Sequence, residues 1–286
     1  MRTRLDAGTA LTSTWLALGA IALWATLATL GLMLSHIPPF LLTGLGLLIG
    51  SIPAWPLARQ WRVPPRTLML GVYGLFGFHF LLFIALRHAP AVTANLVNYL
   101  WPLFIVVFAP MFLRHLRFSL VHVVAALAGF AGAALAIVAD SAPNGADGSF
   151  AWGYVAALAS AWVWASYSLL TRRVAHFPTA AVGLFGLVSG VLSLLCHVWL
   201  EPEVSLTSRD LALLTLLGLG PLGSAFFLWD AALKRGDPRR IGVLSYLTPL
   251  ASTLLLVATS GRPLTPAIAV AALLIVGAAG VGLAAR

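Results

Sequence analysis

Charged residues are scarce in this sequence. Only 9% of its 286 residues are Asp, Glu, Lys or Arg, whereas charged residues make up about 25% of an average soluble protein. Apolar residues make up 60% of the chain. Because so few charges cannot cover the surface of a folded domain in water, the composition excludes a soluble enzyme or binding domain. It favours a protein that is embedded in lipid.

Motifs for catalysis, redox chemistry and nucleic-acid binding are also missing. Cys196 is the only cysteine, so no internal disulfide can form. The sequence contains neither H-E-x-x-H nor G-x-S-x-G, and its G-x-G-x-x-G match at 218–223 lies in an apolar run without a preceding strand. The bases are scattered over short loops despite the net charge of +9. We therefore expect no enzymatic activity, no metal, no cofactor and no nucleic-acid partner.

Long apolar runs are what the sequence has in abundance. A bilayer core is spanned by a helix of about 20 residues, and ten runs of this length follow one another: 11–34, 40–58, 67–86, 91–113, 119–138, 150–171, 179–200, 210–233, 241–259 and 265–284. They leave no room for a soluble domain. The sequence predicts an all-α integral membrane protein with ten transmembrane helices.

The basic residues give the orientation of these spans. If the N-terminus is cytoplasmic, 14 of the 17 Lys and Arg residues fall on the cytoplasmic side, and only Arg87, Arg209 and Arg262 fall on the other. Basic loops are retained in the cytoplasm during insertion. The pattern therefore predicts that both the N-terminus and the C-terminus are cytoplasmic.

One apolar segment with a central proline is written twice. Residues 99–103 read Tyr-Leu-Trp-Pro-Leu and residues 246–250 read Tyr-Leu-Thr-Pro-Leu, at a spacing of 147, which also places Arg87 on Lys234. We expect a first five-helix repeat at 1–138, a periplasmic linker at 139–149 and a second five-helix repeat at 150–286. Since five is odd, the second repeat enters the membrane from the opposite face. Such inverted repeats hold a substrate site near the midplane, at their interface.

The two proline segments are candidate substrate-binding elements. Asn95, Asn98, Tyr99 and Pro102 share one helical face. Proline has no N–H, so Pro102 is expected to break the helix and free the carbonyl of Asn98, as Pro249 would free that of Ser245, beside Tyr246. Polar groups in a bilayer are tolerated against protein or a water-filled cavity. Two interpretations stay open: these groups line a cavity, or they join neighbouring helices by hydrogen bonds.

Three tryptophans lie well inside spans instead of at the membrane interface, where this residue is usually enriched. They are Trp24, Trp101 and Trp164, and the first and last occupy matching positions of the repeat, 140 residues apart. Tyr167 shares a helical face with Trp164. These rings are candidates for contacting the substrate, and ordinary helix packing is the alternative.

Two ionisable groups within spans are functional candidates by default. His79 lies in the middle of the third span, where a neutral imidazole can bind a ligand, carry a proton or satisfy a backbone carbonyl. Asp230 precedes Lys234 by one helical turn, so the sequence favours a structural ion pair between them. The glycine pairs Gly129/Gly132 and Gly277/Gly280 are expected to allow close contact between helices.

The doubled five-helix plan, the proline-centred fourth and ninth spans and the glycine-rich fifth and tenth spans resemble the drug/metabolite transporter superfamily, in its ten-helix EamA-type branch. The segment Asn-Leu-Val-Asn-Tyr-Leu-Trp-Pro at 95–102 is similar to that of bacterial aromatic amino-acid exporters of the YddG type. The resemblance covers almost the whole chain. It implies a central cavity between the halves, a location in the bacterial inner membrane and export centred on aromatic amino acids.

The sequence thus predicts a multi-pass secondary transporter, surrounded by the lipid bilayer, that exports aromatic and other neutral amino acids by alternating access. An exporter of drugs or other cationic compounds is the alternative, although organic cations usually need a buried, unpaired acid. A channel or a helix-packing scaffold represents a different class. Whether protons are coupled to transport, through His79 or Asp230, is left open at this point.

Overall fold

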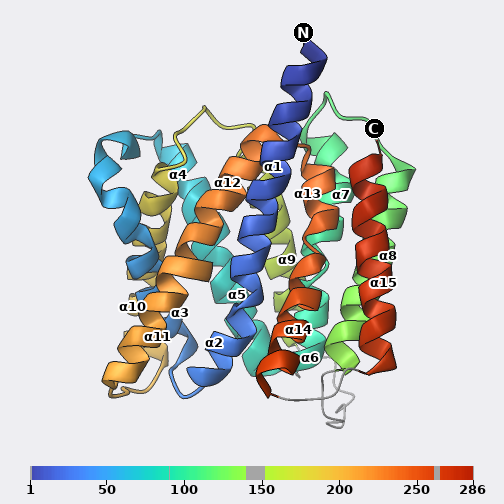
Figure 1. The fold of residues 1–286 in the computed structure, drawn as a ribbon. Coiled ribbons are helices and arrows are strands. Elements are labelled where there is room, and N and C mark those ends of the chain that lie inside the picture. Colours follow the sequence, from blue (N-terminus) through green and yellow to red (C-terminus); the bar gives the residue numbers. More distant parts are fainter. Residues whose placement is uncertain (1, 90, 140–151, 261–264, 286) are drawn as a thin grey trace.

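The computed structural model describes residues 2–89, 91–139, 152–260 and 265–285. This part of the chain is helical and contains no β-strand. The helices stand side by side as an upright bundle, with both termini at the same end (Figure 1). All of the predicted linker 139–149 except its first residue lies outside the described residues.

In the first half, each expected span corresponds to one helix or to consecutive helices. Their bounds are α1 Arg2–Ala25, α2 Leu27–Met33, α3 Pro39–Ser51, η1 Ile52–Trp61, α4 Pro65–Val72, η2 Tyr73–Gly77, α5 Phe78–His88, α6 Ala91–Asn98, α7 Trp101–Phe112 and α8 Leu120–Ala139. The fourth span is therefore interrupted at residues 99–100, between α6 and α7, and Pro102 lies in the first turn of α7, as the proline predicts.

The second half follows the same order. Its helices are α9 Trp152–Leu170, α10 Ala181–Leu200, α11 Ser208–Leu219, η3 Gly220–Ser224, α12 Ala225–Arg235, α13 Pro238–Leu244, α14 Leu247–Ser260 and α15 Pro266–Ala284. The break between α13 and α14 is at residues 245–246, and Pro249 lies in the first turn of α14. The π-helical turns η2 and η3 also match, because their bounds are 147 residues apart at both ends.

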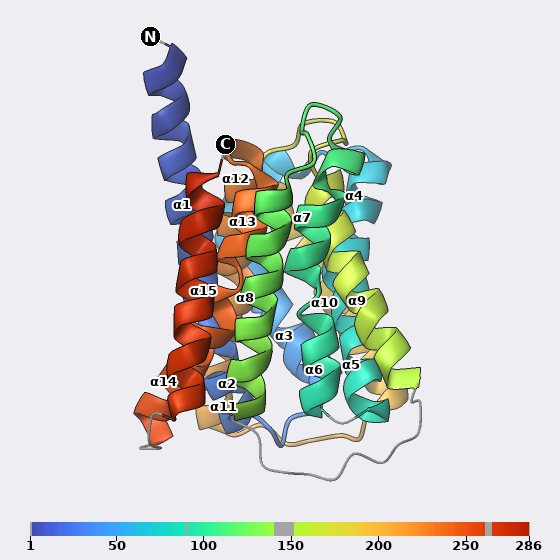
Figure 2. The ribbon, with the colours of Figure 1, turned by 90° about the vertical axis from the view of Figure 1, so that its right-hand side faces the viewer.

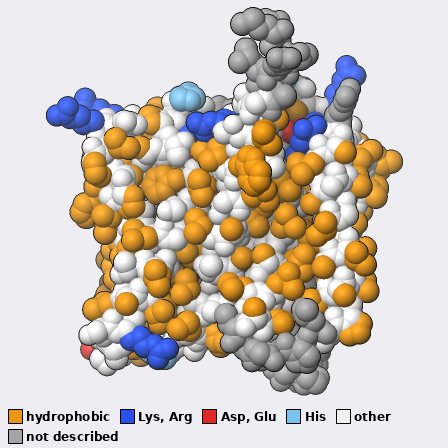
Figure 3. All heavy atoms as spheres, viewed as in Figure 1, with side chains coloured by type: hydrophobic (Ala, Val, Ile, Leu, Met, Phe, Trp, Pro, Cys, Tyr) orange, Lys and Arg blue, Asp and Glu red, His pale blue; other side chains and the backbone are white. Residues whose placement is uncertain are grey.

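Eight helices of the described residues are long and apolar enough to cross a membrane. They coincide with all the expected spans except the fifth, where the apolar stretch is the shorter Leu120–Leu135, and the ninth, which is divided into α13 and α14. Apolar side chains cover the visible flank of the molecule, and Lys and Arg gather at its two ends (Figure 3). This distribution is that of a protein with a lipid-facing belt.

The main helix contacts cross from one half to the other. The fifth span packs on the tenth (α8 on α15), the second on the seventh (α3 on α10), the third on the sixth (α5 on α9) and the first on the eighth (α1 on α12). Figure 2 shows α8 and α15 lying along each other. The halves are interleaved, so residues from both meet at the centre.

Glycines allow the closest of these contacts. A Cβ on Gly50 of α3 would lie 2.7 Å from the carbonyl oxygen of Gly218 and 2.7 Å from the Cα of Gly223, so α3 and η3 meet backbone to backbone. The prediction for Gly129 and Gly132 is confirmed, since both face the second half at contact distance. It is wrong for Gly277 and Gly280, which face open space because α15 turns its other side to α8.

Candidate functional site

Four tryptophans from four helices meet at the centre of the bundle. Trp24 of α1, Trp101 of α7, Trp164 of α9 and Trp229 of α12 are all at most 8% exposed. Trp24 lies 5.2 Å from Trp229, 5.8 Å from Trp164 and 6.4 Å from Trp101, measured between ring centroids. Such geometries are those of favourable aromatic pairs. We call these four residues the tryptophan cluster.

The cluster brings together most of the aromatic residues that the sequence singles out. Trp24, Trp101 and Trp164 are in mutual contact, and Tyr167 lies 5.4 Å from Trp164. Because Trp24 and Trp101 belong to the first half and Trp164 to the second, the cluster lies at the interface between the two halves.

Two indole N–H groups fix the orientation of the rings. Trp24 Nε1 donates to the carbonyl oxygen of Pro221 at 3.1 Å, in the π-helical turn η3. Trp229 Nε1 donates to Ser168 Oγ of α9, also at 3.1 Å. A π-helical turn displaces carbonyls from the regular α-helical pattern, so η3 supplies an acceptor that a regular helix would lack.

His79 borders the tryptophan cluster through Phe226 and Phe78. Its ring centroid lies 6.2 Å from that of Phe226, which in turn lies 5.6 Å from Trp164. The carbonyl of Leu75 can only accept, so His79 Nδ1, at 2.6 Å from it, carries a hydrogen. In a neutral imidazole the other nitrogen, Nε2, is then an acceptor. His79 thus satisfies a backbone carbonyl and still offers one acceptor to a ligand.

At the first helix break, between α6 and α7, one side-chain amide forms a hydrogen bond to another helix. Ser160 Oγ of α9 lies 2.8 Å from Asn98 Oδ1, which ties the end of α6 to the second half. Asn98 is buried, whereas Asn95 and Tyr99 are half-buried. The amide N–H of Tyr99 donates to the carbonyl of Asn95. The side chain of Asn98 therefore joins helices, which is one of the two roles that the sequence leaves open.

The second helix break corrects one expectation. The carbonyl of Ser245 is not free, because the amide N–H of Thr248 donates to it at 3.0 Å, one residue before Pro249. The hydroxyl of Ser245 donates to the carbonyl of Ile241 at 2.8 Å. Tyr246 is fully buried in a separate apolar cluster, against Gly129 and Phe130. The structure does not bring Tyr246 into the tryptophan cluster.

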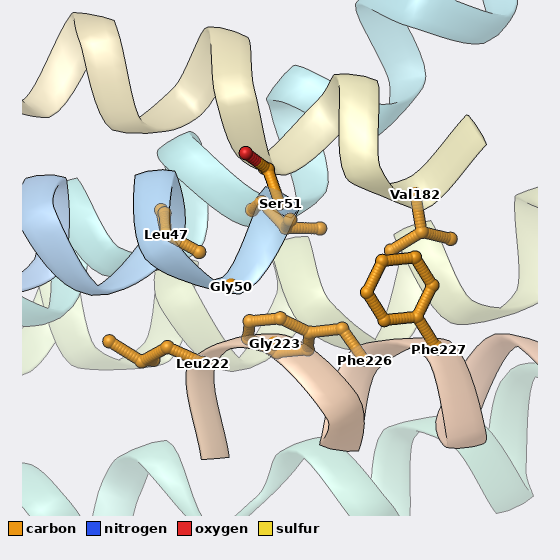
Figure 4. Close-up of a pocket in the computed structure, with 10 residues that line it drawn as sticks. Leu47, Gly50, Ser51, Val182, Leu222, Gly223, Phe226 and Phe227 are labelled. Atoms are coloured by element: carbon orange, nitrogen blue, oxygen red, sulfur yellow. The ribbon is translucent and has the colours of Figure 1, made fainter. Parts of the chain in front are cut away.

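The tryptophan cluster fills the place where an open central cavity is expected. Beside it, a cavity of about 10 Å³, room for about one water molecule, lies between α3, α10 and α12. Figure 4 shows Phe227 of α12 beside Val182, and Ser51 with its hydroxyl pointing away from Phe226. A larger cavity of about 360 Å³ lies at the end that carries the termini, lined by His176, Phe177, Pro178, Thr179, Lys234 and Arg235.

The predicted ion pair between Asp230 and Lys234 is confirmed. Lys234 Nζ lies 2.6 Å from Asp230 Oδ2, and the hydroxyl of Thr179 donates to the same oxygen at 2.7 Å. Asp230 is 3% exposed. A buried carboxylate needs such partners, since an unpaired charge is costly out of water.

Sequence reasoning missed two residues of the centre, Trp229 and Phe226. The spacing of 147 places Phe226 on His79, and these two rings are in contact. Repeat-equivalent residues that touch each other lie where the two halves meet, as Trp24 and Trp164 also do. The repeat therefore held the signal for Phe226. Trp229 has Leu82 as its counterpart, so the repeat gave no signal for it.

The chain is similar to known transporters along most of its length. The model of the EamA-like transporter family matches residues 11–138 and again residues 151–283. The aromatic amino acid exporter YddG of Ancylobacter novellus is 44% identical over 269 residues, 92% of this chain and 93% of that protein. A probable amino-acid metabolite efflux pump of Salmonella typhimurium is 30% identical over 82% of this chain and 83% of that protein.

The fold is similar to that of a solved structure as well. A chain of known crystal structure superposes with a TM-score of 0.90 at 42% identity, covering 95% of this chain and 96% of that chain. The sequence match, the apolar helices and the shared fold agree with one another. This chain is a multi-pass membrane protein that belongs to the EamA-like transporter family.

Proposed function

We propose that this protein is a secondary transporter of the bacterial inner membrane that exports aromatic and other neutral amino acids by alternating access. The observation that carries the proposal is the tryptophan cluster, which is buried at the interface of the two halves. Aromatic rings bind other aromatic rings by stacking and edge contacts. When the cluster opens, it exposes a surface that suits an aromatic side chain. The relatives named as exporters of aromatic amino acids support this substrate class.

Alternating access is supported by the repeat. In the proposed architecture, two inverted five-helix repeats, with both termini cytoplasmic, rock against each other around the central site. The exchange of helix contacts between halves and the two proline breaks fit this scheme. The structure described here has the centre closed, and a central cavity belongs to another conformation. Pro102 and Pro249 are the proposed hinges of that change.

The proposed substrate-contacting residues include those in and beside the tryptophan cluster and the polar groups of the helix breaks. They are Trp24, His79, Asn95, Asn98, Tyr99, Trp101, Trp164, Tyr167, Ser245 and Tyr246. Among them, Ser245 and Tyr246 require the second break to open before they can reach a ligand, because both are fully buried.

Uptake into proteoliposomes tests the substrate class. Labelled phenylalanine or tryptophan should enter liposomes that contain the protein faster than empty ones. Trp101→Ala and Trp164→Ala should each raise the KM about two- to tenfold, the worth of one aromatic contact. Trp199→Ala is the matched control, since Trp199 is 84% exposed. If the two central variants transport like the control, the tryptophan cluster is not the substrate site.

The same liposomes separate the proposal from its main alternative. Tryptophan rings also bind organic cations, so a lipophilic cation is offered in parallel with phenylalanine. Transport of the cation without transport of the amino acid would identify an exporter of cationic compounds. Solute flux that does not saturate would identify a channel.

Proton coupling is tested by imposing a pH gradient on these liposomes. His79 is one candidate proton carrier beside the tryptophan cluster, and its Nδ1 hydrogen is bonded to the carbonyl of Leu75. We propose that His79 acts as a neutral hydrogen-bonding group and that flux follows the amino-acid gradient alone. His79→Ala should then lower the flux without changing its response to the pH gradient. Loss of a wild-type pH response in this variant would instead make His79 the coupling group.

A further inference from the structure

One face of α12 forms a stripe that runs from the centre of the molecule to the end with the termini. Phe226, Asp230 and Lys234 are spaced i, i+4 and i+8 and therefore lie one above the other on the same side of the helix. Phe226 touches the tryptophan cluster at one end of the stripe. Lys234 lines the larger cavity, of about 360 Å³, at the other end. The stripe joins the proposed substrate site to the surface.

The start of α10 and the loop before it form the opposite side of this seam. Phe177 and Thr179 line the larger cavity, and Val182 lines the small one beside Phe226. One seam between α10 and α12 therefore contains both cavities. Asp230 lies between them along α12, bonded to Thr179 across the seam. The ion pair of Asp230 and Lys234 therefore lies in the seam between the two cavities.

The hydrogen-bonding capacity of this ion pair is only partly used. Lys234 Nζ donates to Asp230 Oδ2 at 2.6 Å and to the carbonyl of Phe177 at 2.8 Å, and it lies 3.7 Å from the centroid of the Phe177 ring. Asp230 Oδ1 is buried and has no hydrogen-bond partner. An unbonded carboxylate oxygen in a buried site is costly, so Asp230 retains capacity for a further donor.

We propose that this seam is the entry route from the end with the termini, and that Asp230 and Lys234 bind the charged head group of the amino acid. The carboxylate of Asp230 takes the α-ammonium, and the ammonium of Lys234 takes the α-carboxylate. The inference rests on the proposed function and names how the substrate class is recognised. The volume of the larger cavity, about 360 Å³, lies in the range of ligand sites, about 300–1,000 Å³.

Charge balance explains why a zwitterion suits this pair. Asp230 is buried and Lys234 is half-buried, so separating the two charges is unfavourable because each is left without its partner. A zwitterion supplies one new partner to each of them, so the pair opens without leaving an unpaired charge. An amine supplies a partner only to Asp230, and a carboxylic acid only to Lys234. The seam therefore selects amino acids over molecules that carry the same side chain and a single charge.

Transport of three matched compounds tests the proposal. Phenylalanine, 2-phenylethylamine and 3-phenylpropionate share the aromatic ring and differ in charge. In wild-type proteoliposomes the KM for phenylalanine should be at least about tenfold below the KM for either analogue, as expected when one charge-assisted contact is lost. In the double variant Asp230→Asn with Lys234→Gln, which leaves no unpaired charge, the three values should converge to within about twofold.

Arg59→Gln is the control for loss of a positive charge. Arg59 is exposed in η1 and lines neither of the two cavities. We expect this variant to discriminate as the wild type does. A folded double variant that still favours phenylalanine about tenfold over both analogues would overturn the proposal, because the pair would then be only structural.

A second measurement uses the wild-type chain and needs no folded variant. Lys234 is the only lysine in the sequence, so its acylation by an amine-reactive ester can be followed by the mass of one peptide. Phenylalanine and 2-phenylethylamine also consume the ester through their own amines, so the rate at Lys234 is expressed relative to that of a lysine-containing reference peptide in the same tube. Relative to this peptide, phenylalanine and 3-phenylpropionate should slow the acylation of Lys234, and 2-phenylethylamine should not. An unchanged rate at concentrations that saturate phenylalanine transport overturns the inference alone. A wild-type protein that transports no amino acid overturns both this inference and the proposed function.

Discussion

Each tryptophan at the centre contributes both an apolar ring and a polar N–H group. Trp24 and Trp229 donate their indole N–H groups to Pro221 and Ser168, which fixes these two rings between helices of different spans. A buried N–H group without a partner would destabilise the fold by more than a typical hydrogen bond stabilises it. Trp229 is the most deeply buried of the four, at 1% exposed, so we assign it a positioning role.

Trp229 can be separated into its ring and its donor. Trp229→Phe keeps most of the ring contacts, so it should lower the free energy of unfolding in detergent by about 1 kcal/mol and preserve transport. Trp229→Ala opens a cavity and should cost about 3–5 kcal/mol. Thermal unfolding of the purified protein measures both changes. An equal loss of stability in the two variants would show that the donor, and not the ring, holds the centre together.

Asp237 gives a pH-dependent prediction outside the membrane spans. Burial alone would raise its pKa, but the hydrogen bonds from Arg239, including one of 2.6 Å from Nη2, hold the pKa of Asp237 below its ordinary value. The resulting stability is present above the ordinary Asp pKa of about 4 and is lost as the pH falls through the depressed value.

Asp237→Asn tests this, because asparagine can still cap α13 through its side-chain oxygen. The variant should unfold at a lower temperature than the wild type at neutral pH. The two melting temperatures should approach each other as the pH falls below about 4. A difference that stays constant over this pH range would contradict the role of the charge.

At the scale of helices, contact between spans depends on glycines that admit a neighbouring backbone. Gly50 of α3 is a case of backbone-to-backbone contact, where it meets Gly218 and Gly223. Gly277 of α15 has no atom within 4 Å of an added Cβ. These residues form a natural pair for comparison, since both are glycines within apolar helices.

Gly50→Ala should lower the free energy of unfolding in detergent by about 1–3 kcal/mol, because a Cβ there forces two backbones apart. Gly277→Ala should leave stability unchanged or raise it by up to about 1 kcal/mol, since alanine is the better helix former. Equal melting temperatures for the two variants would mean that α3 and η3 do not pack as closely as described.

The helix breaks yield a prediction about transport and not about stability. Pro102→Ala supplies the missing N–H to the carbonyl of Asn98 and favours a continuous helix. If the break bends during transport, one added hydrogen bond of about 1 kcal/mol should slow flux roughly fivefold. Pro110→Ala, within α7 and away from the break, is the control. Unchanged flux in Pro102→Ala, with a melting temperature no lower than that of the wild type, would remove Pro102 as a hinge.

At the scale of the whole molecule, much of the fold follows from the sequence, because the apolar runs have a fixed length and recur with a fixed spacing. The repeat also predicts Trp24 and Trp164 as a related pair, and their rings are in contact. It could not lead to Trp229, whose counterpart is leucine. The sequence could not predict which face of α15 is exposed either, since both of its faces are apolar. The hydrogen bond to the carbonyl of Ser245 depends on the local turn geometry, which the proline alone does not determine.

The central claim is that aromatic amino acids pass through the tryptophan cluster as the two halves rock between two conformations. Counterflow tests it most directly, because only a carrier with a shared, alternating site couples the movements of labelled and unlabelled substrate. Proteoliposomes loaded with unlabelled phenylalanine should transiently accumulate external labelled tryptophan above its equilibrium level, and Trp164→Ala should weaken this accumulation. Labelled tryptophan that only equilibrates, at a rate independent of the internal phenylalanine, would contradict the account.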